Sequence, residues 1–195
     1  WLKAMREAAR ELDILFVVDE VITGFGRTGP MFACAAEGVE PDLMTMAKGL
    51  TAGYVPMGAT MLSEAVYAAI ADAAPAGAPI GHGATYSAHP VGAAVALEVL
   101  RLYDEGGILD NGRRMAPHFA AGLDALRDHP LVGDARHRGL VGALELVSDK
   151  ASKRGFDPAL ALPDRLFAAA YRNGVVFRCF GDGVLGFAPA LTFTE

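Results

Sequence analysis

The sequence contains few cysteines, no long apolar run and no tract of basic residues. Cys34 and Cys179 are the only two cysteines among 195 residues, and their neighbours match neither a metal site nor a disulfide framework. No apolar run reaches membrane-spanning length. The 17 Lys and Arg residues are dispersed and outnumbered by 23 Asp and Glu residues, which argues against nucleic-acid binding. These absences favour a cytoplasmic protein that binds no metal, membrane or nucleic acid.

The apolar content is ample for a buried core, because 52% of the residues are hydrophobic and 8% are aromatic. The opening residues "WLKAMREAARELD" carry charges every few positions, which is not typical of a signal peptide. They predict an amphipathic helix, so the chain reads like one entered partway. The residues expected on the apolar face of this helix are Trp1, Leu2, Met5, Ala8 and Leu12.

Three apolar runs predict the strands of an α/β sheet. "ILFVVDEV" at 14–21 is rich in β-branched and aromatic residues, which is typical of a strand covered on both faces in a parallel sheet. "PDLMTMAK" at 41–48 and "GATMLS" at 58–63 follow a Gly-rich turn and a short helical piece. Alternating strands and helices indicate part of a doubly wound, mostly parallel sheet, in which ligands bind at the carboxyl ends of the strands.

The pattern changes near residue 107, which predicts two domains. Ser63 is expected to cap a helix that leads into the loop at 74–83, a candidate linker or lid. Pro90 begins a long interdomain helix that ends at Gly106. We therefore expect a large domain over 1–106 and a small α+β domain, incomplete at its end, over 107–195. The small domain is predicted to contain helices near 108–128 and 163–173 and strands at 139–147, 174–178 and 184–189.

Lys48 is an isolated cation in an otherwise uncharged segment. Apart from Tyr54, it is the only ionisable side chain between Asp42 and Glu64. Asp19 and Lys48 both follow predicted strands, so they could simply form a salt bridge. Several glycines around the two residues favour a second reading, in which a flat ligand lies against the backbone. These are Gly24, Gly26, Gly29, Gly49 and Gly53.

Pyridoxal phosphate is a cofactor that needs such a pair. Its aldehyde forms a Schiff base with a lysine amine, and its ring withdraws electrons while the pyridine nitrogen stays protonated beside a buried carboxylate. Opposite charges about 4 Å apart attract by about 4 kcal/mol at an effective dielectric constant of 20, which would hold that proton at neutral pH. Asp19 is the expected carboxylate and Lys48 the expected amine.

Three segments in order, "DEVITGFGRTG", "AKGLTAGYVPMGA" and "GATYSAHPVGAA", resemble the class III (omega) aminotransferases of pyridoxal-phosphate fold type I. The resemblance covers essentially the whole chain. It implies that Asp19 pairs with the pyridine nitrogen, that Val21 packs on the ring face and that Lys48 binds the cofactor covalently. It also implies that Thr85 reaches the cofactor phosphate of a neighbouring subunit, so that the active unit is a homodimer with cofactor-binding residues in 1–106.

The resemblance extends to substrate recognition. Arg178, in "VVFRCFGDGVLGFAP", matches a mobile arginine that grips a substrate carboxylate, and Tyr54 is expected to line the substrate channel. The implied reaction moves an amino group from an amine or omega-amino acid to a keto acid such as pyruvate by a ping-pong mechanism. The alternatives are a related aminomutase or decarboxylase, or a non-catalytic fragment, since the family's phosphate-binding turn lies in a segment that this sequence lacks.

Each site residue also has a purely structural alternative. Val21 could be an ordinary core residue, and Thr85 could cap the turn before Pro90. Arg178 could pair with Asp182, and Tyr54 could serve in packing alone. For Arg27, a structural role that pins its loop is the favoured interpretation.

Overall fold

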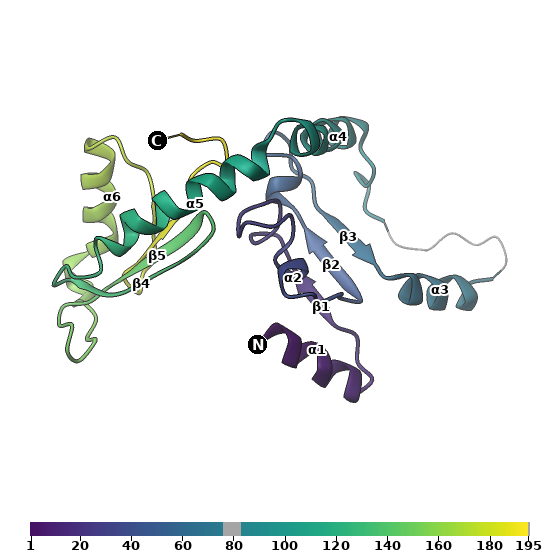
Figure 1. Ribbon diagram of the computed structural model, residues 1–195, viewed down its shortest axis with the longest axis horizontal. Coiled ribbons are helices and arrows are strands. Elements are labelled where there is room, and N and C mark those ends of the chain that lie inside the picture. Colours follow the sequence, from purple (N-terminus) through teal and green to yellow (C-terminus); the bar gives the residue numbers. More distant parts are fainter. Residues whose placement is uncertain (76–82, 195) are drawn as a thin grey trace. The chain divides into compact units, whose positions relative to one another are not determined.

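The computed structural model describes residues 1–75 and 83–194, and the chain divides into two compact units (Figure 1). Unit 1 comprises Trp1–Gly26 and Pro30–Gly107, and unit 2 comprises Arg27–Gly29 and Ile108–Glu195. Most of the predicted linker or lid, at 76–82, lies outside the described residues. Within the described ranges, no helix combines the length and apolar character needed to cross a membrane.

Unit 1 contains a small sheet with helices, as expected for an α/β fold. The sheet has the order β1-β2-β3, in which β1 is parallel to β2 and β3 is antiparallel to β2. The parallel register places Asp19 opposite Thr45. The elements of unit 1 are α1 (Leu2–Glu11), β1 (Val17–Asp19), α2 (Ala33–Ala36), β2 (Leu43–Met46), the 3₁₀ helix η1 (Lys48–Leu50), β3 (Ala59–Leu62), α3 (Glu64–Ala73) and α4 (Pro90–Glu105).

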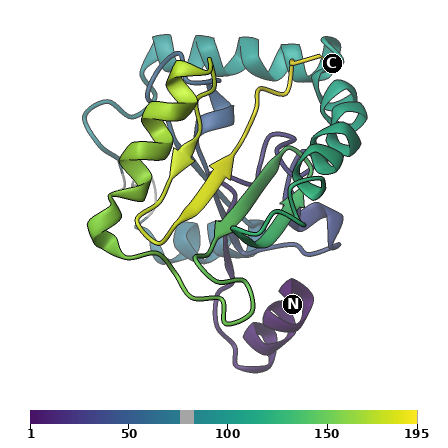
Figure 2. The same ribbon diagram turned by 90° about the vertical axis from the view of Figure 1, so that its left-hand side faces the viewer.

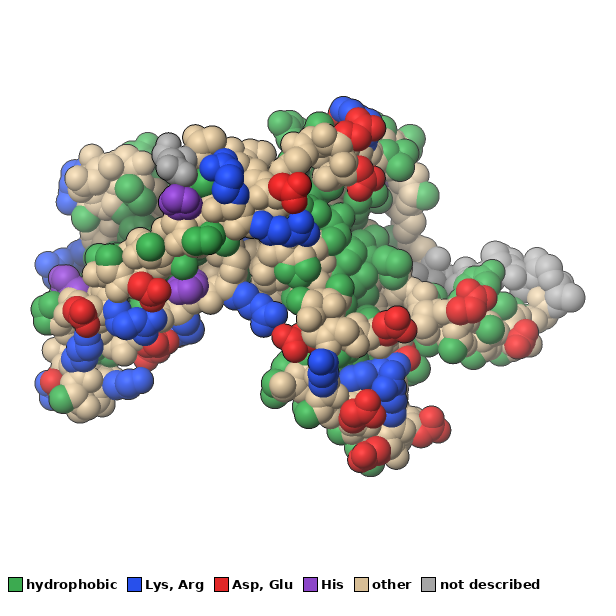
Figure 3. Space-filling view, in the orientation of Figure 1, with side chains coloured by type: hydrophobic (Ala, Val, Ile, Leu, Met, Phe, Trp, Pro, Cys, Tyr) green, Lys and Arg blue, Asp and Glu red, His purple; other side chains and the backbone are tan. Residues whose placement is uncertain are grey.

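One face of this sheet packs against a hydrophobic core, and the other is open. Met44 and Met46 of β2 point into the core, where they join Ala96 of α4 and Phe25 from the turn after β1. Val17, by contrast, is 54% exposed, and Ile14 and Leu15 are exposed as well, whereas Phe16 packs against the core. Within the described part of the chain, β1 is covered on one face only, and its cover on both faces stays a prediction. Hydrophobic side chains gather over the strands of unit 1 in Figure 3.

The apolar face predicted for α1 packs on the core only in part, through Leu2. Trp1 is 89% exposed, whereas Ala9 is buried. The rotation of the helix is set by Arg6, whose guanidinium forms two hydrogen bonds of 2.5 and 2.9 Å with the carboxylate of Asp42. The same carboxylate accepts a 2.7 Å hydrogen bond from the backbone N–H of Phe16. An ion pair thus overrides the apolar periodicity in choosing which side of α1 faces the sheet.

The boundaries of the two following helices agree with their sequence signals. The hydroxyl of Ser63 accepts a hydrogen bond from Val66 N–H and caps α3, as predicted. Pro90 is the first residue of α4 and Gly106 follows its last, also as predicted. His89 caps α4 by accepting from Val91 N–H at 3.3 Å.

Unit 2 is an antiparallel sheet packed against helices. Figure 2 looks towards this sheet, whose strand order is β4-β5-β7-β6. Leu123 of α5 and Leu166 of α6 share one hydrophobic cluster with Leu144 and Leu185 of the sheet. The elements are α5 (Ile108–Asp124), β4 (Val132–Arg138), β5 (Val141–Leu146), the 3₁₀ helix η2 (Pro158–Leu160), α6 (Leu162–Arg172), β6 (Arg178–Cys179) and β7 (Val184–Phe187).

A glycine allows α5 to approach the sheet closely. A Cβ atom at Gly142 of β5 would lie 2.3 Å from a methyl carbon of Leu123 and 3.1 Å from the ring of Phe119, both on α5. A larger residue here would therefore force the Leu123 side chain into another conformation and displace the Phe119 ring by a few tenths of an ångström. The small residue lets these two side chains pack directly on β5.

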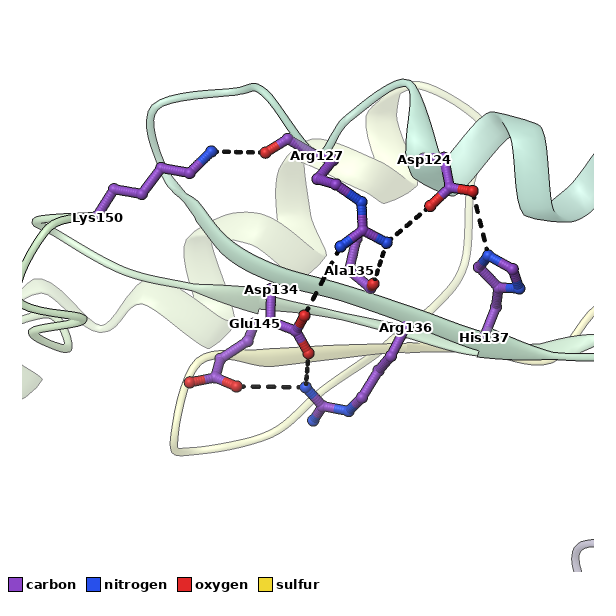
Figure 4. Close-up of polar contacts among 8 residues, drawn as sticks. All are labelled: Asp124, Arg127, Asp134, Ala135, Arg136, His137, Glu145 and Lys150. Carbon is purple, nitrogen blue, oxygen red and sulfur yellow. Dashed lines mark hydrogen bonds and ion pairs between the residues drawn. The ribbon is translucent and has the colours of Figure 1, made fainter.

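An exposed network of ion pairs joins the end of α5 to β4 and β5 (Figure 4). Arg127 lies at its centre and donates to Asp124 at 2.8 Å and to the carbonyl of Ala135 at 2.6 Å. Because such exposed pairs are weakened by the surrounding water, the network adds little to the stability of unit 2. Its remaining members are Asp134, Arg136, His137, Glu145 and Lys150.

The Arg6–Asp42 pair generates a stability prediction. Asp42→Asn should destabilise unit 1 by about 2 kcal/mol, because it removes the charge opposite a largely buried guanidinium. Arg6, and then Phe16 N–H, hold the pKa of the Asp42 carboxyl below its usual range. This stabilisation is therefore present above the unfolded-state pKa and is lost as the pH falls through the lowered folded-state pKa. Hydrogen exchange of the β1 peptide should report the loss.

The matched control is Glu7→Gln, which removes an exposed ion pair from the same helix. It should change stability by less than about 0.5 kcal/mol. Equal exchange rates in the two variants would show that the Asp42 pair does not fix α1 to the sheet.

Candidate functional site

Asp19 and Lys48 lie at the same edge of the unit 1 sheet. Asp19 is the last residue of β1, and Lys48 follows the end of β2 by two residues. Because β1 and β2 are adjacent and parallel, their carboxyl ends meet at one edge, and neighbouring strands are about 4.8 Å apart. The β-ladder continues past β1 through a 2.9 Å hydrogen bond from Glu20 N–H to Thr45 C=O. Asp19 and the segment that carries Lys48 thus leave neighbouring strands at the same edge of the sheet.

The Asp19 carboxylate is oriented by its own turn. Its Oδ1 atom accepts a 2.9 Å hydrogen bond from the backbone N–H of Val21, whereas no contact of Oδ2 is found in the described ranges. The side chain is exposed on the open face of the sheet. Burial of this carboxylate therefore stays a prediction, because the described residues leave this face of β1 uncovered. It is the next residue, Glu20, that is fully buried.

Lys48 has a strained backbone and a free amine. Its φ is +43°, in the left-handed region that is uncommon for residues with a side chain and that costs about 1–2 kcal/mol. The neighbouring Gly49 lies against Phe25, since a Cβ atom at Gly49 would be 2.5 Å from the Phe25 Cβ atom. Packing below the chain therefore holds Lys48 in place. Its side chain is exposed, and no described residue forms an ion pair or hydrogen bond with its Nζ atom.

The salt bridge between Asp19 and Lys48 that the sequence left open is not formed. Within the described part of unit 1, neither side chain makes an ion pair. A carboxyl group and an amine at one sheet edge, each without an ionic partner among the described residues, are available to bind a ligand. A structural salt bridge therefore does not explain why these two residues occur together.

Three further candidate residues of unit 1 lie at or near the described surface. Val21 is half-buried in the turn after β1, and Tyr54 is 83% exposed. Thr85 is exposed in the turn before α4. It caps neither element there, because His89 caps α4 and the hydroxyl of Ser87 closes the turn by accepting from Ala84 N–H. The capping role considered for Thr85 is therefore wrong.

Arg178 belongs to unit 2, apart in the chain from the other candidates. It lies on β6, and its guanidinium stacks over the ring of Phe180 at 5.6 Å from the ring centre. No ion pair with Asp182 is found among the described residues. The partner of Arg178 is thus Phe180, by a cation–π contact, and not Asp182, which the sequence left open as an alternative.

Arg27 has the structural role predicted for it. Its guanidinium donates to the carbonyl oxygens of Leu140 at 2.9 Å and Pro189 at 2.5 Å, and its own carbonyl accepts from Leu140 N–H. These bonds pin residues 27–29 to unit 2. The prediction that Arg27 fixes its loop is confirmed.

The residues at the sheet edge fit pyridoxal phosphate chemically. An acid and a nucleophilic amine stand on adjacent strands, and Oδ2 of Asp19 and Nζ of Lys48 carry no ligand from the described protein. Phe25 leaves no room for a side chain at Gly49, the residue after the lysine. Lys48 and Asp19 would hold opposite ends of the cofactor ring, and the open sheet face would leave space for it.

Sequence reasoning missed Glu20 and Phe25, which support this edge from below. Glu20 is fully buried and Phe25 is 2% exposed. The sequence offered one signal for each residue: a second carboxylate directly after Asp19, and an aromatic residue between two glycines. Neither signal distinguishes a buried position from an exposed one, because Asp-Glu pairs and Gly-Phe-Gly turns are common on surfaces.

Known proteins share both the sequence and the fold of this chain. The family described as aminotransferase class-III matches residues 1–195. A putrescine–pyruvate aminotransferase of Pseudomonas aeruginosa is 43% identical over 187 residues, covering 95% of this chain and 40% of that protein. Among solved structures, an (S)-enantioselective omega-transaminase from Thermomicrobium roseum is 40% identical with a TM-score of 0.93, covering 100% of this chain and 42% of that one.

An aminotransferase from Vibrio fluvialis in its PMP-bound form is 36% identical, with a TM-score of 0.93 and coverage of 100% of this chain and 43% of that one. The chain belongs to the class III aminotransferase family. Its solved neighbours are transaminases of fold type I, and it spans about two fifths of the length of the relatives that it matches.

The contact below Lys48 generates a prediction. Gly49→Ala should destabilise unit 1 by about 1–3 kcal/mol, because the new methyl group would overlap the side chain of Phe25. Thermal unfolding of the complete protein would measure the loss. Gly155→Ala is the matched control, since a Cβ atom there meets nothing within 4 Å. If both variants unfold at the same temperature, the close approach of Gly49 to Phe25 is wrong.

Proposed function

We propose that the complete protein containing this chain is a pyridoxal-phosphate-dependent aminotransferase. The observation that carries the proposal is the pairing of Asp19 and Lys48 at the carboxyl edge of adjacent parallel strands, both without ionic partners. Membership of the class III family supports it, as does the PMP-bound form of the Vibrio fluvialis relative. When bound, pyridoxal phosphate supplies an electron sink for the carbon that carries the amino group.

Lys48 and Asp19 have separate roles in this proposal. The Nζ atom of Lys48 is the nucleophile that holds the cofactor, and once released it moves a proton to and from the reacting carbon. The carboxylate of Asp19 keeps a proton on the ring nitrogen by charge attraction. Val21 orients that carboxylate through its backbone N–H and packs against the ring face.

The remaining site residues are assigned to phosphate and substrate. Thr85 has an exposed hydroxyl with no capping role, which suits a contact to the cofactor phosphate of a second subunit in a homodimer. Tyr54 is exposed on the loop after η1 and lines the substrate channel. Arg178 binds a substrate carboxylate and stacks on Phe180 when the substrate has none.

The proposed donors are amines or omega-amino acids, and the proposed acceptor is a keto acid such as pyruvate. The putrescine–pyruvate relative supports both classes. Unit 1 serves as part of the cofactor-binding domain and unit 2 as part of the small domain. A cytoplasmic location agrees with Cys34 and Cys179, which are both unpaired thiols.

Covalent trapping tests the assignment of Lys48. Borohydride reduction of the complete protein with pyridoxal phosphate should leave a pyridoxyl group on the Lys48 peptide, and Lys48→Arg should remove the label and the formation of alanine from pyruvate. Lys150→Arg is the control lysine exchange and should leave both unchanged. A label on any other lysine would show that the cofactor site lies elsewhere. Labelling without alanine from any amine donor would favour an aminomutase or decarboxylase.

The role of Asp19 generates a separate prediction. Asp19→Asn should lower kcat by about 1000-fold, because a charge interaction of about 4 kcal/mol is lost. The change should leave protein stability nearly unaltered, since the side chain is exposed. Asp13→Asn replaces another exposed aspartate of unit 1 and should retain full activity. A kcat within tenfold of the wild-type value in Asp19→Asn would reject this role.

A further inference from the structure

We propose that Glu20 is a positioning residue that fixes both Asp19 and Lys48 at the sheet edge. This inference rests on the proposed function, and it concerns a residue that does not itself reach the open face of the sheet. Glu20 is the one fully buried acidic side chain of the described core. The chemistry assigned above makes no use of it, so its burial needs another explanation.

The Glu20 carboxylate is held by donors from two segments of the chain. Its Oε2 atom accepts a 2.5 Å hydrogen bond from the hydroxyl of Thr23, within the same turn. Its Oε1 atom accepts a 2.7 Å hydrogen bond from the backbone N–H of Cys34, at the start of α2. Burial alone would raise the pKa of Glu20, but these hydrogen bonds outweigh it and lower that pKa. The carboxylate is therefore an anion that ties the turn at 20–24 to α2.

This tie reaches Asp19 through the backbone. Glu20 N–H bonds to Thr45 C=O of β2, and Glu20 C=O accepts from Gly24 N–H at 2.9 Å. The position of the turn thus fixes the direction in which β1 ends. It also fixes Val21, whose N–H holds the Asp19 carboxylate. Moving the Glu20 side chain would therefore move the atoms that aim Asp19.

The Glu20 anchor also affects Lys48, through Phe25, which comes directly after the turn at 20–24. Phe25 adopts a φ of +55°, a strained value that its surroundings must enforce. Its ring packs edge-on against Phe32 at a centroid distance of 5.5 Å, and its carbonyl accepts from the Tyr103 hydroxyl at 3.1 Å. The side chain of Phe25 also contacts the backbone of Gly49. One turn, anchored by one buried anion, therefore positions the residue beside Lys48 as well as Asp19.

Gly24 leaves no room for a side chain beside the Glu20 anchor. A Cβ atom at Gly24 would lie 2.8 Å from the Glu20 carbonyl oxygen and 3.2 Å from the ring of Phe32. Burial, followed by the nearby Glu20 carboxylate, raises the pKa of the Cys34 thiol to about 11, so the thiol stays neutral and adds no competing charge. The anion, the glycine and the ring form one packed unit beneath the sheet edge.

The experiment compares Glu20→Gln with Asp42→Asn in the complete protein. Both variants change a carboxylate of unit 1 into an amide. Asp42 is a suitable control because it lies just before β2, at the opposite end of that strand from Lys48. For Glu20→Gln we expect about a 100-fold weaker affinity for pyridoxal phosphate, because the charge-assisted hydrogen bonds that hold the turn are lost or weakened. We also expect a shifted pH midpoint of the visible absorption band of the bound cofactor. Asp42→Asn should lower the thermal midpoint and leave affinity and band unchanged.

Thr23→Val is a milder second variant that removes the hydroxyl donor and preserves the shape of the side chain. It should weaken cofactor affinity by about tenfold and shift the band in the same direction as Glu20→Gln. It decides the question if Glu20→Gln does not fold. Wild-type affinity and band in both variants, with only lower thermal midpoints, would confine Glu20 to stability and overturn the inference.

The outcome also separates this inference from the proposed function. If the wild-type protein itself binds no pyridoxal phosphate, the proposed function is wrong and the role of Glu20 falls with it. If the wild type binds the cofactor at Lys48 and the Glu20 variants match it, only the positioning role is wrong.

Discussion

The parallel pairing of β1 with β2 is the constraint on which the candidate site depends. Because both strands run in the same direction, their last residues meet at one edge, and the acid of one strand and the amine after the other become neighbours. An antiparallel pair would place them at opposite ends. The backbone hydrogen bond from Glu20 to Thr45 extends the pairing beyond the last residue of β1. The geometry of the site is thus set by main-chain bonding before any side chain contributes.

Packing beneath the edge then determines how the chain leaves the two strands. Both Phe25 and Lys48 hold left-handed backbone conformations, which persist only where neighbouring groups enforce them. Phe25 is enclosed by two aromatic rings, Phe32 and Tyr103, and Gly49 allows the lysine loop to lie directly on it. The exposed side chain of Lys48 is therefore positioned by the buried Phe25, which contacts the next residue, Gly49.

The sequence predicts what local chemistry determines and fails where distant contacts decide. Ser63, Pro90 and Gly106 mark helix ends correctly because capping and ring constraints act within a few residues. The buried face of α1 could not be predicted, since it depends on an ion pair with Asp42, 36 residues beyond Arg6. The strand β4 was missed because its charged residues suit an exposed edge and obscure the alternation. For the site, the positions of Asp19 and Lys48 after their strands were predictable, whereas the burial of Glu20 in place of Asp19 was not.

The open face of the unit 1 sheet bears on how this polypeptide is made in the cell. Val17 of β1 and the preceding Ile14 and Leu15 are all more than half exposed, and uncovered apolar segments of this kind attract one another between copies. Until other parts of a complete protein or a second subunit cover them, these residues favour aggregation of the newly made chain. Chaperone binding during synthesis would follow from the exposure of these same side chains.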